Sequence, residues 1–453
     1  MRRSLAIAGA AALACAASAP LHAQGSGVDQ QSACMSGRVG AGIASPCDDA
    51  SGVYFSPGGL ALQGSNIGIG VTLIRAGGEF TYDPGREPVG TASHITRETE
   101  IVPVPQIFLS YKATPRLAAA IGAFAPYGLG LDWPVCDASQ STASCTAAGT
   151  TNFEGRYTGY DNSLRAYYVQ PTLSYELIPG VLSVGAGLDL VHSTIEVHQR
   201  ADAPTVGLRG FDIADATLKG SGNGITGHVG AVLRISDRTR VGVRYLHRTK
   251  VDLEGDADFT QVPTGTIFDP LLAAQFAAGG PLEDQGIATT ITFPSQFVAG
   301  VSFRPVEVLN LLFDYQRTGW SSFDRFDIDF QGAGGVDRTL NLNYRNTNTF
   351  RAAAQFDYSD AVAIRLGYRY NTAATPRATP FLPEGERNYY TAGLGLRLTR
   401  ALTTDLSFQY INQPDRRGAV RPDEPVIGVY GATGQTFGVT FSYHFGAQPN
   451  ALQ

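Results

Sequence analysis

The chain has 453 residues, 53 of them glycine, and only 16% are charged, well below the roughly 25% of typical soluble domains. Its formal net charge is −6 and its arginines are scattered, which excludes the clustered basic surface of a nucleic-acid-binding protein. No run of about 18 consecutive apolar residues is present, so the sequence contains no candidate for a bilayer-spanning helix.

The first 23 residues have the parts of a secretory signal peptide. Arg2 and Arg3 precede an apolar run from Leu5 to Ala17, and the small residue Ala23 offers a cleavage site. The apolar run is too short to span a membrane. We therefore expect an exported protein whose mature chain begins at Gln24.

Residues 24–63 are rich in glycine and alanine, show no strand pattern, and include Cys34 and Cys47. The other cysteines of the processed chain are Cys136 and Cys145. An even number of cysteines in an exported protein predicts disulfides. Three pairings are possible, and the local ones, Cys34–Cys47 and Cys136–Cys145, would close short loops.

From residue 64 onward, apolar and polar residues alternate in fourteen runs. The runs begin near residues 65, 99, 116, 163, 181, 213, 239, 287, 307, 345, 361, 388, 401 and 434. A period of two predicts strands with one apolar and one polar face. Short connections such as Ile178–Gly180 alternate with long ones, at 83–98, 131–162, 200–212, 259–286, 319–344, 372–387 and 413–433. Short turns on one side, long loops on the other and an even strand number are typical of an outer-membrane β-barrel.

The runs between Phe350 and Tyr410 favour a transmembrane barrel over a soluble β-sandwich. Aromatic residues gather at the ends of the apolar faces, as they do at membrane interfaces, while arginine and aspartate occupy the middle of the polar faces. By parity, nine charged residues should face the lumen: Arg244, Arg248, Asp314, Arg351, Asp357, Arg365, Arg369, Arg397 and Asp405. We expect most of them to pair with each other or with Asp48 and Asp49, because an unpaired half-buried charge is costly. The alternative is that Arg365, Arg369 or Arg397 binds an anionic ligand head group.

A fourteen-stranded barrel encloses a lumen too wide for side chains alone to fill. Residues 24–63 are therefore predicted to fold inside the barrel as a plug, or hatch. A periplasmic tail is the alternative. The predicted all-β architecture is thus a signal peptide (1–23), a hatch (24–63), a fourteen-stranded antiparallel transmembrane β-barrel (64–445) and a short tail (446–453).

Two further segments are candidates for a role in transport. Asp269–Gly280 has the caps of a short helix, and its apolar residues Leu271, Leu272 and Phe276 would lie on an outer loop. They either pack against a neighbouring loop or offer a landing site for an apolar ligand. In the third run, Gly122, Pro126 and Gly128 flank Phe124 and should interrupt the strand with a kink or inward bend.

Motifs for catalysis and metal binding are missing. The sequence has no G-x-S-x-G and no H-E-x-x-H, and the glycine motif at 222–227 lacks a strand–turn–helix context. Asp252, Glu254, Asp256 and Asp258 alternate, which fits a solvated rim or a weak cation site, but they lack the calcium-loop glycine and terminal glutamate. We expect no enzyme activity, no metal and no cofactor.

Several motifs together resemble the long-chain fatty-acid transporters of the FadL type, a family that includes aromatic-hydrocarbon channels. The similar stretches are Asp48–Ser51, Ser56-Pro57-Gly58-Gly59-Leu60, Pro126–Leu129, Gly319–Asp324 and Thr375–Pro383. The resemblance implies a hatch near 24–62, with Asp48, Asp49, Ser56 and Pro57 among its residues. It also implies an outer groove at Leu271, Leu272 and Phe276, an inner pocket and a lateral exit at Gly122–Gly128. The family's Asn-Pro-Ala is Ser56-Pro57-Gly58 here.

The sequence thus predicts a passive channel for hydrophobic compounds, such as long-chain fatty acids or aromatic hydrocarbons, in the outer membrane of a Gram-negative bacterium. Its other partners would be outer-membrane lipid and lipopolysaccharide, and we expect a monomer. The alternative function is a passive pore for small hydrophilic solutes through the arginine-lined lumen.

Overall fold

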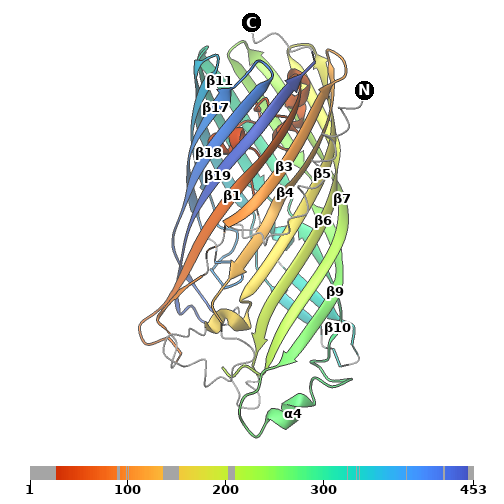
Figure 1. The fold of residues 1–453 in the computed structure, drawn as a ribbon, viewed down its shortest axis with the longest axis vertical. Helices are drawn as coiled ribbons and strands as arrows, with labels where there is room; N and C mark the ends of the chain where they lie inside the picture. Colours follow the sequence, from red (N-terminus) through yellow and green to blue (C-terminus); the bar gives the residue numbers. More distant parts are fainter. Residues whose placement is uncertain are drawn as a thin grey trace.

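The computed structural model describes residues 27–446, except 89–91, 98, 100, 136–152, 203–209, 324, 333, 336, 384 and 422–423. The predicted signal peptide, the pair Cys136–Cys145, Asp324 and the tail beyond Gly446 lie outside the described residues. The described chain is a tall barrel of tilted strands, with its C-terminal end opposite helix α4 (Figure 1). None of its described helices has the length and apolar character needed to cross a membrane.

The barrel wall contains nineteen strand segments in the described chain. They are β1 (Ser65–Tyr82), β2 (His94–Thr96), β3 (Ile101–Lys112), β4 (Leu117–Asp132), β5 (Asp161–Ile178), β6 (Leu182–Ala201), β7 (Ala214–Ser236), β8 (Thr239–Leu246), β9 (Thr249–Gln261), β10 (Gln285–Phe293), β11 (Gln296–Val306), β12 (Leu309–Thr318), β13 (Arg325–Phe330), β14 (Arg338–Asn341), β15 (Thr347–Ser359), β16 (Val362–Asn371), β17 (Arg387–Arg397), β18 (Leu402–Gly418) and β19 (Gly428–Phe445).

Five pairs of consecutive segments are the two parts of one interrupted wall strand: β2/β3, β8/β9, β10/β11, β12/β13 and β14/β15. β7, for example, pairs with β8 through one half and with β9 through the other. The segments therefore form the fourteen antiparallel strands predicted from the sequence. The first and last strands, β1 and β19, pair over their full length from Ser65↔Phe445 to Tyr82↔Gly428, so the sheet closes on itself into a barrel.

The two faces of the wall differ as predicted. Outward positions expose large apolar side chains such as Leu366 and Phe437, which are 60% and 54% exposed, whereas Arg351 and Arg365 point inward and are buried. Arg248 was predicted to face inward but is exposed. The reason is the two-residue break between β8 and β9, which shifts the parity of the strand that follows.

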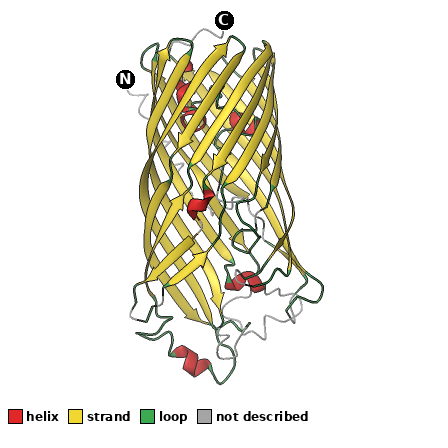
Figure 2. Cartoon of the chain, turned by 180° about the vertical axis from the view of Figure 1, so that it is seen from behind, coloured by secondary structure: helices red, strands yellow, loops and turns green. Residues whose placement is uncertain are grey.

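The short helices lie inside the barrel and in its long loops (Figure 2). They are α2 (Ala33–Gly37), α3 (Gly52–Phe55), η2 (Pro57–Leu62), η4 (Glu154–Tyr157), α4 (Asp269–Ala273) and η6 (Trp320–Phe323). The first three belong to residues 27–63, which are almost entirely buried within the wall at the end opposite α4. The described part of the predicted hatch therefore occupies the lumen.

Candidate transport site

A buried carboxylate fixes the first described turn of the hatch to the far wall. Asp29 accepts hydrogen bonds from Arg351 at 2.9 Å and forms an ion pair with Arg369 at 2.6 Å. The Tyr54 hydroxyl also donates to it, at 3.3 Å. Further along, Asp314 of β12 accepts the backbone N–H groups of Gly42 and Ile43 at 2.8 and 3.1 Å. Charge-assisted contacts of this kind are stronger than neutral hydrogen bonds, so the hatch is firmly held on this side.

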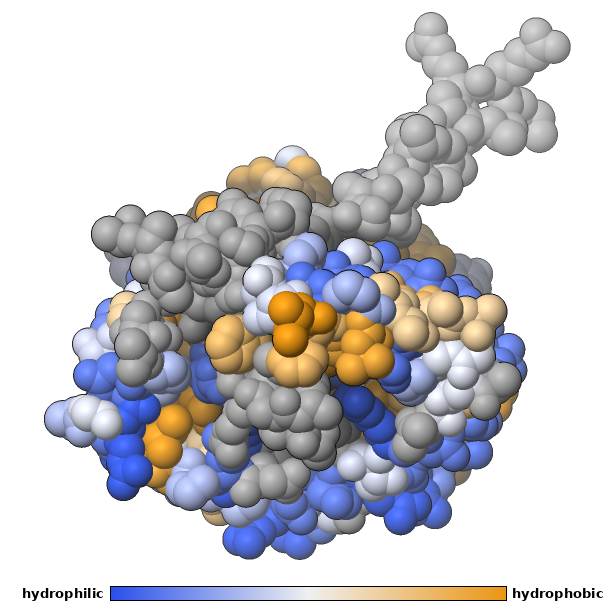
Figure 3. Space-filling model, turned by 90° about the horizontal axis from the view of Figure 1, so that it is seen from below, coloured by the Kyte–Doolittle hydropathy of each residue, from blue (hydrophilic) through white to orange (hydrophobic). Residues whose placement is uncertain are grey.

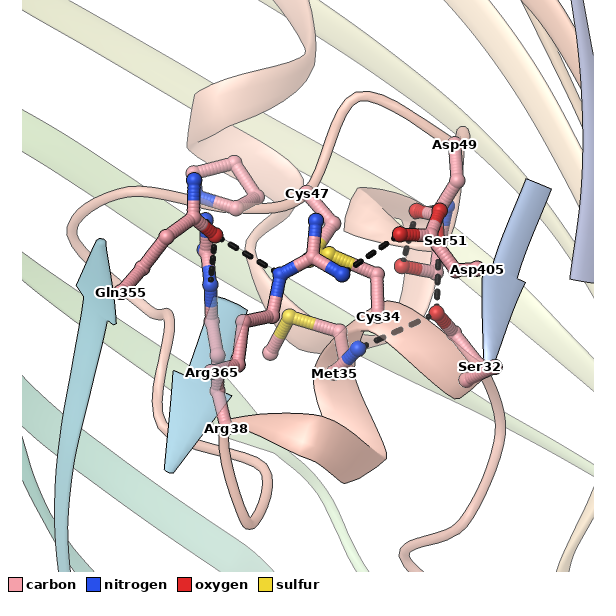
Figure 4. Close-up of a disulfide and its surroundings, with 12 residues drawn as sticks. Ser32, Cys34, Met35, Arg38, Cys47, Asp49, Ser51, Gln355, Arg365 and Asp405 are labelled. Carbon is pink, nitrogen blue, oxygen red and sulfur yellow. Dashed lines mark hydrogen bonds and ion pairs between the residues drawn. A yellow bond between two sulfur atoms is a disulfide. The ribbon is translucent and has the colours of Figure 1, made fainter. Parts of the chain in front are cut away.

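A second cluster surrounds the disulfide Cys34–Cys47, which is one of the three pairings left open by the sequence (Figure 4). The Arg38 Nη2 atom donates to Gln355 at 2.5 Å, and Arg365 pairs with Asp405 at 2.5 Å. Asp49 accepts hydrogen bonds from the hydroxyl groups of Ser32 and Ser51. These contacts fix helix α2 against strands β15 to β18.

The hatch also approaches the wall closely where both surfaces carry glycine. A Cβ atom at Gly37 would lie 2.9 Å from the Cα atom of Gly393 on β17, a distance that no real side chain tolerates. On the opposite side, Ser174 of β5 donates to the carbonyl of Gly58 and receives the N–H of Ala61. The hatch is thus in contact with the wall on several sides, and the lumen is occupied at this level.

An apolar cavity of about 310 Å³ lies between the wall and the long loops. It is lined by Leu164, Ile195, Leu218 and Leu253 of the wall, and by Phe323, Phe326, Ile328, Tyr344, Phe381 and Leu382. The cavity volume is at the lower end of the range for small-molecule sites, which are mostly apolar with a few polar groups. Two of the stretches that carry the family resemblance, Gly319–Asp324 and Thr375–Pro383, contribute to this lining.

The loop that forms one side of the cavity is fixed by polar contacts. The indole N–H of Trp133 donates to the carbonyl of Pro380 at 3.0 Å, and Ala419 N donates to the carbonyl of Ala378 at 3.1 Å. Arg421 forms ion pairs with Glu154 and Asp202, which joins three outer loops. The outer end of the barrel is therefore capped by mutually bonded loops.

Four aromatic rings pack together in a buried cluster that also contains residues of the hatch and of the cavity lining; we refer to Tyr127, Tyr168, Phe293 and Trp320 as the septum. The Tyr127 ring stacks on Phe293 at 5.1 Å and meets Tyr168 and Trp320 at 6.0 Å each. Tyr127 and Trp320 line a separate polar pocket of about 60 Å³ together with Gly27 and Asp29 of the hatch, whereas the neighbouring Phe323 lines the apolar cavity.

The septum is held closed by a hydrogen bond across the lumen. The Tyr127 hydroxyl donates to the carbonyl of Pro294, at the break between β10 and β11, at 3.0 Å. Gln296 donates to the same hydroxyl at 2.9 Å and accepts from Arg244 at 2.5 Å. Tyr127 is fully buried and can reach the opposite wall because the outer half of β4 bends inward.

The bend in β4 lies where the sequence predicted an interruption, within Gly122–Gly128. The β4–β5 register shifts between Phe124 and Tyr127, and almost every residue beyond Gly122 is buried on both faces. β3 pairs with β4 only as far as Ile107↔Ala123. Beyond that point the two strands separate, and we call the unpaired region, bounded by β3 residues 101–106 and β4 residues 124–132, the seam.

The hatch fills the seam. Val28 donates its backbone N–H to the carbonyl of Pro126 at 2.8 Å, and Gln31 donates to the carbonyl of Ala125 at 2.7 Å. The Val28 side chain packs in a buried cluster with Ala125 and with Ile74, Val102 and Val104 of the adjoining wall. The hatch therefore satisfies two backbone acceptors in the bent half of β4.

The six residues that the sequence proposed for ligand binding do not lie together. Leu272 is buried against Ile213 and Ala214 with Phe276 packed beside it, while Leu271 is 64% exposed. Arg365 and Arg369 are engaged by Asp405 and Asp29, and Arg397 is exposed at the end of β17. Of these six, none lines the 310 Å³ cavity, and Arg369 lines only the 60 Å³ polar pocket.

The hatch candidates make local contacts. Asp48 accepts from Asn66 at 3.1 Å and lies 3.5 Å from His444, while Asp49 caps its serine neighbours. Ser56 donates to the carbonyl of Ile43 at 2.6 Å, and Pro57 begins η2. The polar partners of Asp48 and Asp49 are thus serine, asparagine and histidine, not the luminal arginines that we expected.

Sequence reasoning missed Val28, Asp29 and the septum residues Tyr168 and Phe293. Val28 and Asp29 occur in a glycine-rich stretch without periodicity, so no local pattern distinguishes them. One signal was available: β3 reads Ile-Val-Pro-Val-Pro-Gln from residue 101 to 106, and proline is tolerated in a sheet only where no partner needs its N–H.

The closed, plugged fourteen-stranded barrel with a lipid-facing exterior defines the class of outer-membrane channel proteins. The chain belongs to the family described as "Outer membrane protein transport protein (OMPP1/FadL/TodX)", whose profile matches residues 13–445. The protein is therefore an outer-membrane protein of a family that transports hydrophobic compounds.

Relatives and solved structures agree with this assignment. The chain is 21% identical over 416 residues to "Outer membrane protein P1" of Haemophilus influenzae, covering 83% of each chain. It superposes on a Pseudomonas aeruginosa FadL homologue with a TM-score of 0.78 at 19% identity, covering 93% of this chain and all of that one. The Pseudomonas putida toluene transporter TodX gives a TM-score of 0.69 at 16% identity, covering 94% and 100%.

Proposed function

We propose that the protein takes up small hydrophobic molecules, such as long-chain fatty acids or aromatic hydrocarbons, by passive diffusion through the outer loops, the apolar cavity and the β3–β4 seam. The observation that carries this proposal is the presence, in the described chain, of an apolar cavity, an aromatic septum and an opening in the wall at which residues of the hatch lie. TodX, which shares the fold, is named a toluene transporter, and this supports the same ligand class.

The first step would be capture at the outer end. Ile267 is 90% exposed and, with Leu271 and Phe268, forms an apolar tip on α4 and the loop before it. Apolar surface is present at this end of the molecule among hydrophilic residues (Figure 3). α4 packs on the start of β7, whose later residue Leu218 lines the cavity. An apolar ligand that binds at the tip can therefore move along β7 toward the cavity.

The second step would be binding in the cavity. Removing apolar ligand surface from water stabilises the complex by roughly 25 cal/mol per Å², and no energy source is needed. Lipopolysaccharide opposes the passage of apolar molecules through the outer leaflet. The ligand would bypass it by leaving the barrel laterally, through the seam in the wall. Passage then requires that Tyr127 move away from Pro294 and that Val28 leave the seam. A ligand favours this state only if it binds it more tightly than the closed state.

The filled lumen argues against a steadily open pore for hydrophilic solutes. A pocket between the hatch and Arg369 of the wall has a volume of about 60 Å³, enough for only a few water molecules. A hydrophilic pore would need the whole hatch to leave.

The test is uptake by proteoliposomes that contain the full-length protein. Radiolabelled toluene and palmitate should enter faster than into protein-free vesicles, whereas glucose should not. Phe381→Asp places a charge in the cavity from a loop position and should reduce uptake at least tenfold. The matched variant Val308→Asp, in a turn at the opposite end, should leave it unchanged. Equal entry of glucose, or no effect of Phe381→Asp, would contradict the proposal.

A further inference from the structure

The seam is unusual because a wall strand lies there with one edge unpaired at membrane depth. β3 stays paired with β1 up to Arg75↔Ile101, but its pairing with β4 stops at Ile107↔Ala123. Six residues of β3 therefore have a strand neighbour on one side only. In a bilayer, unpaired backbone groups are costly, so two adjacent strands with free edges should close on each other.

The sequence of the seam opposes that closure. If the β3–β4 register continued beyond Ile107↔Ala123, the next positions would place Pro105 opposite Ala125, Val104 opposite Pro126 and Pro103 opposite Tyr127. Three successive pairs after the first missing one would each contain a proline. Proline has no N–H to donate to a ladder.

The prolines remove donors from the seam in either phase of the ladder. In antiparallel strands, alternate residues direct their N–H groups toward the same neighbour. If the odd residues of β3 face β4, Pro103 and Pro105 remove two donors from the seam. If instead the even residues of β3 face β4, the pair of Val104 with Pro126 lacks one donor, because Pro126 has no N–H. The continuous β3–β1 ladder indicates the first case, because prolines are tolerated where their missing N–H has no partner.

The faces of β3 match this arrangement. Val102 and Val104 point inward, are 1% exposed and contact Val28 of the hatch, whereas Pro105 points outward and is exposed. The hatch thus reaches the seam from inside, while nothing in the described wall covers it from outside.

We propose that Pro103, Pro105 and Pro126 keep the β3–β4 seam permanently unzipped, so that Val28 of the hatch, not strand pairing, is what closes the lateral exit. The inference rests on the proposed function, because it assigns these prolines to the exit of that route. It makes the exit reversible: when Val28 withdraws, the wall does not zip shut behind it, and the carbonyls of Ala125 and Pro126 attract the hatch back.

The experiment compares the full-length wild type with P103V/P105V, since valine supplies the missing donors and favours strands. Hydrogen–deuterium exchange of the β4 peptide containing residues 124–132, which has the same amides in both proteins, should slow at least tenfold as β3 pairs with β4. Uptake of toluene and palmitate into proteoliposomes should fall at least tenfold. P171V, a proline of the neighbouring strand β5 outside the seam, is the matched control and should change neither quantity. The single variant P105V provides a milder case if the double variant does not assemble.

Unchanged exchange in P103V/P105V would overturn the proposal, because the prolines would then not be what keeps the strands apart. Slower exchange with unchanged uptake would overturn it as well, because the seam would not be the exit. Failure of the proposed function is recognised separately: the wild type would then take up neither probe faster than protein-free vesicles, and the exchange measurement would still decide whether the prolines hold the seam open.

Discussion

Replacing Asp29 by asparagine should release the hatch from the seam. The Asp29 carboxylate forms ion pairs with both Arg351 and Arg369. In the chain, Asp29 directly follows Val28 and lies two residues before Gln31, whose side chain donates to β4. Removing one member of a buried ion pair costs about 3–5 kcal/mol. We expect a cost at the lower end of this range, because in the variant Arg351 would still donate to Gln316 at 2.7 Å and Arg369 to Asn371 at 2.7 Å. Asparagine preserves the shape, so no cavity term is added.

A cost of about 3 kcal/mol shifts the equilibrium between docked and released hatch by roughly 150-fold, since 1.4 kcal/mol corresponds to a factor of ten. The assay is amide exchange of the peptide containing Val28, whose N–H is bonded to Pro126. Exchange should accelerate by about that factor, and uptake of toluene should rise. Asp83→Asn, which removes an exposed ion pair with Arg417, is the control and should do neither. If Asp29→Asn leaves Val28 as protected as before, the ion pairs do not hold the hatch and the reasoning fails.

Three other outcomes are expected. Tyr127→Phe removes the hydrogen bond to Pro294 and leaves a Gln296 donor unpaired, so it should lower the free energy of unfolding, measured by urea titration, by about 1–3 kcal/mol. Tyr127→Phe should also speed uptake modestly, and Tyr127→Ala should speed it more. Slower uptake in either variant would contradict the closing role of Tyr127. Leu271→Asp should slow uptake without altering protease resistance of the loop, whereas Leu272→Asp should increase cleavage there, because only Leu272 is buried. Burial alone would raise the pKa of Asp202, but the hydrogen bond from Arg421 and the N–H of Gly210 lower it below 3.8. The ionised Asp202 carboxylate therefore stabilises the loops above about pH 5, and this contribution is lost as the pH falls through 3.8 and then through the lowered pKa. Amide hydrogen exchange of the outer loops should accelerate over that pH window in the wild type but not in Asp202→Asn.

The wall was predictable because its chemistry repeats. Residues such as Phe350 and Arg351 lie on opposite faces of a strand whose two environments, lipid and lumen, differ along its whole length, so a period of two specifies the fold. The same reasoning located the bend at Gly122–Gly128, because proline and glycine weaken a ladder wherever they stand. It failed at Arg248, where a two-residue break with no sequence signal exchanged the faces.

The site was predictable only in part, because it depends on side chains that meet across the lumen. Phe381 and Leu218 both line the cavity although they are far apart in the chain, and nothing local indicates that they face each other. The luminal charges were expected to pair with each other or with hatch groups such as Asp48 and Asp49. Arg365 does pair with Asp405, but the hatch carboxylate that reaches Arg369 is Asp29, because the path of the hatch decides which carboxylate reaches which strand.

The disulfide between Cys34 and Cys47 has a consequence for biogenesis. Both cysteines are buried, 3% and 2% exposed, inside a wall that is closed by pairing of β1 with β19. An oxidising enzyme of the periplasm reaches them most readily before the hatch packs in the lumen. Oxidation at that stage would give the insertion machinery a chain whose beginning is already a covalent loop.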